Sequence, residues 1–240
     1  MKRIFLSLLL LASFFAIQAK TLVVYYSYTY NVHNIVAELS RQIDADVVRI
    51  EPAEKGLDYA ADNYAIGSAQ IAAIRNNPGD AASYPAIDPV NVNLADYDCI
   101  IIGAPLWWSQ MAAPLQTYLF HNGKAMAGKK IGLIVSSASS GISGVEADAR
   151  RLIPDGDFLT PSLWIRSSQT SNASSLIAGW LSQIGYHNFS GITITPDDQF
   201  PAKYTIFSVD GRMIASNALS LQTLGRGLYI INGKKIYLND

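Results

Sequence analysis

Apolar positions along residues 20–186 alternate between strand-like runs and helix-like stripes. Apolar runs at 22–26, 47–50, 99–103 and 130–135, with a fifth inside 157–165, are typical of strands covered on both faces. Val32, Ile35, Val36 and Leu39 recur at helical spacing. Helices are also expected over 58–76, over 114–120, over 144–153 and after a cap at 171 or 172, with a loop over 77–93. This alternation predicts a doubly wound α/β domain of five parallel strands with helices on both faces.

The pattern changes after about residue 190. Residues 205–209 and 213–214 flank a turn at Asp210-Gly211, and residues 227–231 and 235–238 flank another at Asn232-Gly233. Apolar runs joined by such turns predict β-hairpins. We therefore expect an α/β domain over 20–190 and a small C-terminal β appendage over 191–240.

The first residues predict export. Lys2 and Arg3 precede an almost unbroken apolar run over 4–17, and the small residue Ala19 follows. This is the layout of a secretory signal peptide over 1–19, with cleavage after Ala19. A membrane-spanning helix needs about 20 apolar residues, so no stable membrane insertion is expected after cleavage. The alternatives are an uncleaved anchor or a buried first strand.

Charge and cysteine content limit the classes of function that the sequence allows. Without Lys2 and Arg3, about 16 basic residues face 19 acidic ones, and no basic cluster of the kind that binds nucleic acid is present. Cys99 is the sole cysteine and lies in an apolar run, so it is expected to be a buried thiol. No metal site is expected.

Ligands of doubly wound sheets bind beyond the carboxyl ends of the strands, so the loops after residues 26, 103 and 135 are the candidate site. The first of these loops, 27–33, offers hydroxyls at Ser27 and Thr29 and the amides of a helix start, which suit a phosphate. In the alternative, Asn31 only caps the helix. His33 is either a further donor to phosphate or a solvated first-turn residue.

The other two loops have a different chemistry. Trp107 and Trp108 follow the strand over 99–103, where they either cover a flat ligand or pack on the domain's own core. The loop over 136–144 is rich in serine and glycine, so its backbone can approach a ligand closely, although it can also be a plain flexible turn.

Together, the Ser-x-Thr-x-Asn, Gly-x-Pro-x-Trp-Trp and Ser-Ala-Ser-Ser-Gly-Ile loops resemble those of the flavodoxin family over residues 20–186. The resemblance implies a flavodoxin-like fold and FMN as cofactor. It implies that one loop holds the phosphate and the other two flank the isoalloxazine ring. The implied cofactor-binding residues are Ser27, Thr29, Tyr30, Asn31 and Val32 for the phosphate loop, Pro105, Leu106, Trp107 and Trp108 on one side of the ring, and Ser139, Ser140 and Gly141 on the other. Tyr30 and Val32 depart from the family pattern, which usually has glycine and threonine there.

The C-terminal segments 207–214 and 227–235 resemble a short sorting domain of the type IX secretion system. That resemblance implies passage to the cell surface or the medium, whereas a β extension packed on the main domain implies a periplasmic protein.

Three functions remain open at this point. The leading one is an exported FMN-dependent oxidoreductase or electron carrier, which serves a redox partner or reduces a small quinone-like substrate. The alternative is a flavin-free binding or surface module whose phosphate loop has decayed. A serine hydrolase is less favoured because no Gly-x-Ser-x-Gly elbow accompanies Ser109. No catalytic residue is named, since none of the three loops contains an acid–base pair.

Overall fold

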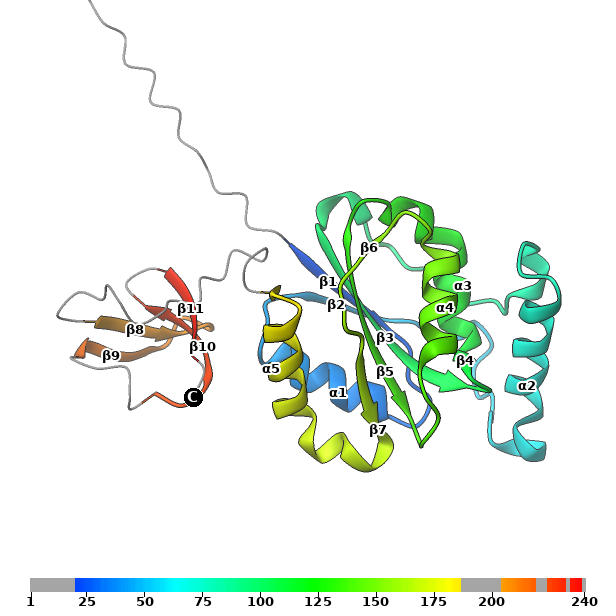
Figure 1. The fold of residues 1–240 in the computed structure, drawn as a ribbon, viewed down its shortest axis with the longest axis horizontal. Coiled ribbons are helices and arrows are strands. Elements are labelled where there is room, and N and C mark those ends of the chain that lie inside the picture. The colour runs from blue at the N-terminus through cyan, green and yellow to red at the C-terminus, as the bar shows by residue number, and fades with distance from the viewer. Residues whose placement is uncertain (1–19, 187–203, 219–223, 232–233, 239–240) are drawn as a thin grey trace, which may run out of the picture.

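The computed structural model describes residues 20–186, 204–218, 224–231 and 234–238. Residues 20–186 form a parallel sheet between two helical layers (Figure 1). The neighbouring strands run in the order β2, β1, β3, β5, and the last position beside β5 is shared by β6 and β7. Their bounds are β1 Thr21–Tyr25, β2 Asp46–Arg49, β3 Cys99–Trp107, β5 Lys130–Ser137, β6 Asp157–Phe158 and β7 Leu163–Arg166. The predicted five-position parallel sheet is confirmed, with its fifth position divided between two short strands.

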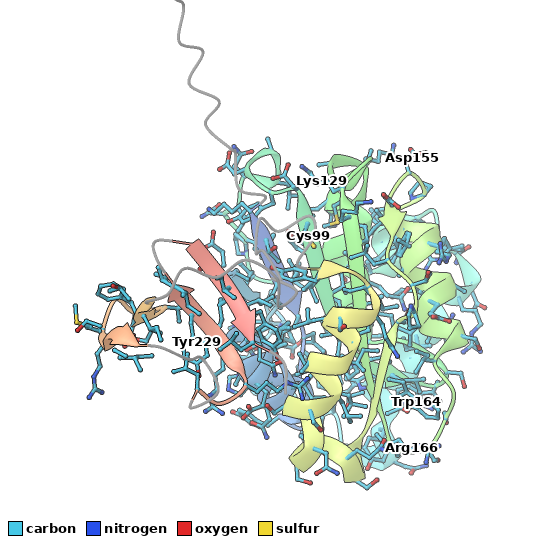
Figure 2. The ribbon with its side chains drawn as sticks, turned by 60° about the vertical axis from the view of Figure 1, so that its left-hand side comes forward. Cys99, Lys129, Asp155, Trp164, Arg166 and Tyr229 are labelled. Atoms are coloured by element: carbon cyan, nitrogen blue, oxygen red, sulfur yellow. The ribbon has the colours of Figure 1, made fainter. Side chains whose placement is uncertain are left out.

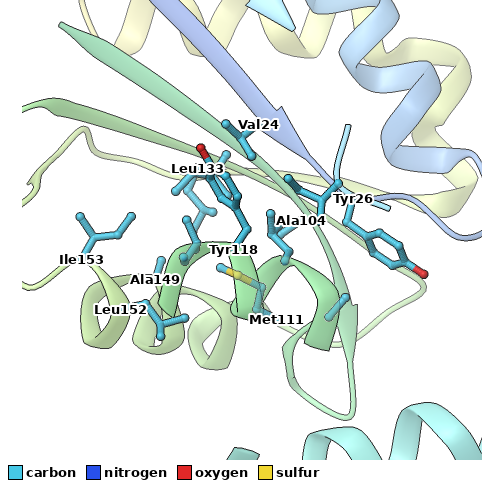
Figure 3. Close-up of a cluster of buried hydrophobic side chains, with 14 of the residues drawn as sticks. Val24, Tyr26, Ala104, Met111, Tyr118, Leu133, Ala149, Leu152 and Ile153 are labelled. Atoms are coloured by element: carbon cyan, nitrogen blue, oxygen red, sulfur yellow. The ribbon is translucent and has the colours of Figure 1, made fainter. Parts of the chain in front are cut away.

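Helices cover both faces of the sheet, as the alternating pattern predicts. Helices α1 (Asn31–Ser40) and α5 (Ala173–Gln183) bury one face, where Trp180 is the largest side chain. Helices α3 (Ala113–Asn122) and α4 (Ser143–Leu152) cover the other face, and α2 (Ala61–Asn76) packs beside them. Figure 3 shows part of this second cluster. Cys99 is buried between the layers, where burial raises the pKa of its thiol to about 12.

Two helix starts differ from the prediction. Helix α2 begins at Ala61 rather than 58, and Asp62, Asn63 and Tyr64 have left-handed backbone angles, so regular helix follows only after them. Helix α5 has no side-chain cap at Asn172, because a 3₁₀ segment over Ser167–Asn172 leads directly into it. Before α2, Asp58 accepts the amide of Ala60 at 2.9 Å in a local turn. Within the predicted loop over 77–93 lies a short 3₁₀ turn, Ala81–Ser83.

The C-terminal residues form a separate antiparallel sheet in the order β11, β10, β8, β9. Strands β8 (Tyr204–Ser208) and β9 (Met213–Ala218) make one predicted hairpin, and β10 (Gly227–Ile231) and β11 (Lys234–Leu238) make the other. This sheet packs on the α1–α5 face through Leu228 and Tyr237, and the Lys235 ammonium pairs with Asp44 at 2.8 Å. Figure 2 shows it beside α5. The expected signal peptide lies outside the described residues, and among those described no helix is long and apolar enough to cross a membrane.

Strand β3 continues four residues past its predicted end. It runs to Trp107 and turns back through Trp108 and Ser109 into β4 (Gln110–Met111), which pairs antiparallel with it. Both turn residues have positive φ, 45° and 64°, as the tight type I′ hairpin turn requires. The tryptophans therefore belong to a β-hairpin and not to a loose loop.

The first turn of α4 approaches this hairpin at a point where only glycine fits. A Cβ on Gly144 would lie 1.8 Å from the carbonyl oxygen of Ser109. Real Cβ atoms do not come that close to backbone, and the Ser109 carbonyl cannot move without opening the turn. Gly144 thus fixes the distance between the hairpin and the serine-rich segment before α4.

Gly144→Ala is expected to lower the free energy of unfolding by about 1–3 kcal/mol, the usual cost of overpacking, because the new methyl group displaces the hairpin turn. Urea unfolding followed by circular dichroism measures the change. Gly141→Ala is the matched control, since a Cβ there has nothing within 4 Å. Equal unfolding midpoints for the two variants would contradict the close approach.

Candidate cofactor site

The three predicted loops meet at one edge of the sheet. Strand β3 pairs in parallel with both β1 and β5, so the chain leaves all three strands at the same end. Strands β2 and β7 also end there, at Arg49 and Arg166. The carboxyl edge is therefore built from five strand ends rather than from the three that the sequence singled out.

The first loop leaves helix donors unpaired. Helix α1 starts at Asn31, directly after Tyr30, and the Ser27 hydroxyl accepts the amide of His33 at 3.2 Å. The acceptor for this first-turn amide is therefore the Ser27 hydroxyl and not the Asn31 side chain, so the interpretation of Asn31 as a cap is wrong. Within the described residues, the amides of Asn31 and Val32 have no protein acceptor, and no acidic side chain lies in the first turn. Such a helix start favours an anion.

A chain of hydrogen bonds links the first loop to the third. The Asn31 side-chain amide donates to the Thr29 hydroxyl at 3.3 Å and to the Ser167 hydroxyl at 3.4 Å. Ser167 in turn donates to the carbonyl of Ser137 at 3.3 Å. Sequence reasoning missed Ser167, although its place directly after a strand was a usable signal.

Tyr30 and Val32, the two departures from the expected motif, behave differently. Tyr30 has φ 62° and a 57 % exposed side chain, so it takes the left-handed conformation that glycine would adopt without filling the loop. The Val32 side chain is 1 % exposed and packs in the α1–α5 cluster. Of Val32, only the backbone amide remains available to a ligand.

Arg49 supplies a cation that the sequence did not point to. It ends β2, its guanidinium donates to the carbonyl of Ser27 at 3.1 Å, and it lies 5.4 Å from the Tyr30 ring. Its Nε also forms an ion pair with Glu51 at 2.8 Å, so the guanidinium is shared between the Ser27 carbonyl and the Glu51 carboxylate. His33 lies behind the loop, with Nδ1 bonded to the Tyr25 hydroxyl at 2.7 Å. Burial raises the pKa of Tyr25, so this hydroxyl stays protonated.

The two tryptophans divide between core and surface. Trp107 is half-buried against Tyr26 and Tyr59, at ring distances of 5.6 Å and 4.8 Å. Trp108 is 41 % exposed and lies over Gly67 of α2. Trp107 therefore packs on the domain's own core, whereas Trp108 remains accessible to a ligand.

A buried polar network fixes the return strand of the hairpin. The Asp148 carboxylate accepts the amide of Met111 at 3.0 Å and the Arg151 guanidinium at 2.9 Å. Arg151 also donates to Gln116 at 2.7 Å, and Gln116 donates to the carbonyl of Met111 at 2.7 Å. Because every member of this network is paired, it holds β4 against α3 and α4 and so fixes the tryptophans that precede β4.

The third loop is exposed where a ring contact is expected. Ser139, Ser140 and Gly141 are all exposed, and the carbonyl of Ser140 accepts the Ser137 hydroxyl at 2.8 Å. Ser137 also accepts the indole N–H of Trp164 at 2.8 Å.

On the facing hairpin, Pro105 and Leu106 are half-buried strand residues. The structure thus brings the predicted residues to one edge, with Val32 facing inward.

Comparison with known proteins agrees with this geometry. The sequence profile of the flavodoxin family matches residues 20–184. A Bacteroides eggerthii protein assigned as a flavoprotein is 23 % identical, with a TM-score of 0.56 over 70 % of this chain and 98 % of its own. A second, from Bacteroides uniformis, is 24 % identical, with a TM-score of 0.53 over 67 % and 98 % of the chains. A Lactobacillus acidophilus flavoprotein, solved in complex with FMN, is 22 % identical, with a TM-score of 0.51 over 65 % and 99 %.

These structures share the fold, and the profile covers more than half of the sequence. The chain belongs to the flavodoxin family.

Proposed function

We propose that this protein binds FMN and acts as a redox protein outside the cytoplasm. The observation that carries the proposal is a helix start with unpaired amides, set beside an aromatic hairpin at one sheet edge. Membership of the flavodoxin family supports it, as does the FMN complex of the Lactobacillus acidophilus relative in fold.

The residues fit such a cofactor. The amides of Asn31 and Val32, with the hydroxyl of Thr29 and the side chain of Asn31, would hold the phosphate. Arg49, which is paired with Glu51, places a guanidinium beside the loop. The ring would lie between the hairpin, at Pro105, Leu106, Trp107 and Trp108, and the exposed segment Ser139, Ser140 and Gly141.

FMN, when bound, would supply reversible electron or hydride transfer. The chain's own residues then orient the cofactor and exclude water, which is the protein's usual share of flavin chemistry. Trp108 would cover one side of the ring because it is accessible and its hairpin is rigidly held. No catalytic residue is assigned: His33 is bonded to Tyr25, and His121 lies at the far end of α3. The acceptor is a redox partner or a small quinone-like molecule.

Export is part of the proposal. Its support is the positively charged start, the apolar run over 4–17 and Ala19, together with the sorting-domain resemblance of the C-terminal hairpins. The protein would be periplasmic, or secreted or surface-bound if the C-terminal sheet acts in sorting.

A flavin-free module is the second candidate, and one observation favours it. The Val32 side chain is buried in the α1–α5 cluster, so the loop lacks the threonine hydroxyl that the family usually has there. Loss of a hydrogen bond to a charged group costs about 1.5–3 kcal/mol, which weakens the hold on a phosphate.

Titration of the flavin-free protein with FMN is expected to quench flavin fluorescence and to saturate. Tyr30→Gly is expected to retain binding and to raise the free energy of unfolding by about 1 kcal/mol, because glycine adopts this conformation without strain. Fluorimetry and urea unfolding measure the two effects. A colourless protein that leaves the fluorescence unchanged at high micromolar FMN would favour the flavin-free module.

Val32→Thr, which restores the family's residue, is expected to lower the free energy of unfolding by about 1–3 kcal/mol. The reason is that the new hydroxyl enters the apolar α1–α5 cluster. Val47→Thr is the matched control, because Val47 is 43 % exposed and should tolerate the change. Comparable stability of both variants in urea would show that position 32 reaches polar surroundings.

Expression in a bacterium with an outer membrane is expected to yield a mature chain that begins at Lys20, as N-terminal sequencing of the non-cytoplasmic fraction would show. Protein that begins before residue 15, or that is recovered from the cytoplasm alone, would contradict export.

A further inference from the structure

An aromatic cleft of about 220 Å³ lies between the β3–β4 hairpin and α2. Its walls include five aromatic side chains and one glycine: Tyr28, Tyr59, Tyr64, Trp107, Trp108 and Gly67. Pockets for drug-sized ligands measure about 300–1,000 Å³, so this cleft suits a smaller molecule of one or two fused rings.

Gly67 lets the indole of Trp108 lie directly against α2. A Cβ at this position would lie 3.0 Å from one ring atom of Trp108 and 3.5 Å from Trp107. Any larger side chain would therefore push the Trp108 indole away from α2 and displace one wall of the cleft. Glycine inside a helix is unfavourable by about 1 kcal/mol relative to alanine, and the close indole contact offsets that preference here.

Backbone strain is concentrated around the same cleft. The described residues include six non-glycine residues with positive φ, and all of them lie before α1, in the first turn of α2 or in the hairpin turn. Tyr64 and Trp108 are two of the six, and they remain 52 % and 41 % exposed. Residues held in this way persist where the surrounding structure imposes them, and they gather at ligand sites.

The cleft presents no free charge. None of the residues that line it is acidic or basic. The Tyr28 hydroxyl donates to Asp58 at 2.9 Å, which raises the pKa of Tyr28 and keeps the phenol neutral. Asp58 also accepts the amide of Ala60 at 2.9 Å, so this carboxylate is already engaged. A lining without a basic residue disfavours an anion, and the test below distinguishes a flat ring from a quaternary ammonium ion, which aromatic faces also attract.

The cleft shares the hairpin residues Leu106, Trp107 and Trp108 with the expected flavin ring, but its other walls come from α2 and the segments before α1 and α2. No residue of the 136–144 segment lines it, whereas the ring would lie between that segment and the hairpin. Thr29 of the phosphate loop does line it, so the cleft is next to the proposed cofactor seat, on the α2 side of the tryptophans.

We infer that this cleft binds a flat, uncharged aromatic ring, and that it is where the quinone-like substrate docks. The role as a substrate position rests on the proposed function; the binding of a ring does not. Aromatic faces and edges supply the affinity through stacked and edge-to-face contacts.

The test is calorimetric titration with 2,3-dimethyl-1,4-naphthoquinone, whose substituted ring resists attack by lysine and cysteine. Wild-type protein is expected to bind it equally well with and without saturating FMN. Tyr64→Ala and Gly67→Ala are expected to weaken binding about tenfold or more, because the first removes a wall and the second displaces the Trp108 wall. Gly179→Ala, in α5, is the matched control, since a Cβ there has nothing within 4 Å.

Fluorimetric FMN titration of Tyr64→Ala should match that of the wild type. Loss of naphthoquinone binding on addition of FMN would overturn the inference, because the cleft would then be the flavin seat. Displacement by tetramethylammonium, or wild-type affinity in both variants, would also overturn it. A protein that binds the naphthoquinone but never FMN would retain the ring site while the proposed function fails.

Discussion

The parallel pairing of β3 with both β1 and β5 determines where every part of the candidate site lies. Through this pairing, the start of α1, the tryptophan hairpin and the segment before α4 reach one edge. A register shift by one residue would exchange the two faces of a strand and disrupt both apolar clusters. The energy that fixes the site is therefore mostly apolar burial in the sheet, since β1 and most of β3 and β5 are buried.

Local contacts with α4 then fix the position of the hairpin. Gly144 places α4 directly against the Ser109 carbonyl, and Asp148 from the same helix binds the amide of Met111 just beyond the turn. One helix thus holds both the turn and the return strand of the hairpin. This arrangement explains how the Trp108 side chain stays exposed, because these contacts hold the backbone at Trp108 and prevent it from moving toward the core.

Sequence reasoning succeeded where one period or motif determines the answer. The apolar runs predicted all five sheet positions, and the Asp210-Gly211 turn predicted its hairpin. The three loops predicted the edge of the sheet at which the candidate site lies. It failed where distant residues decide. The continuation of β3 to Trp107 depends on α4, and the contributions of Arg49 and Ser167 depend on which strands are neighbours. The aromatic cleft joins residues from three separate segments, and no local pattern encodes such a meeting.

The same geometry explains how one chain can carry both the candidate cofactor site and an added C-terminal sheet. That sheet packs through Tyr237 and Lys235, and Lys235 pairs with Asp44, which lies past the carboxyl end of α1. The phosphate seat is at the opposite end of this helix, which spans ten residues and hence about 15 Å. A contact that served sorting could therefore form on the C-terminal sheet while the carboxyl edge stayed open to cofactor and substrate.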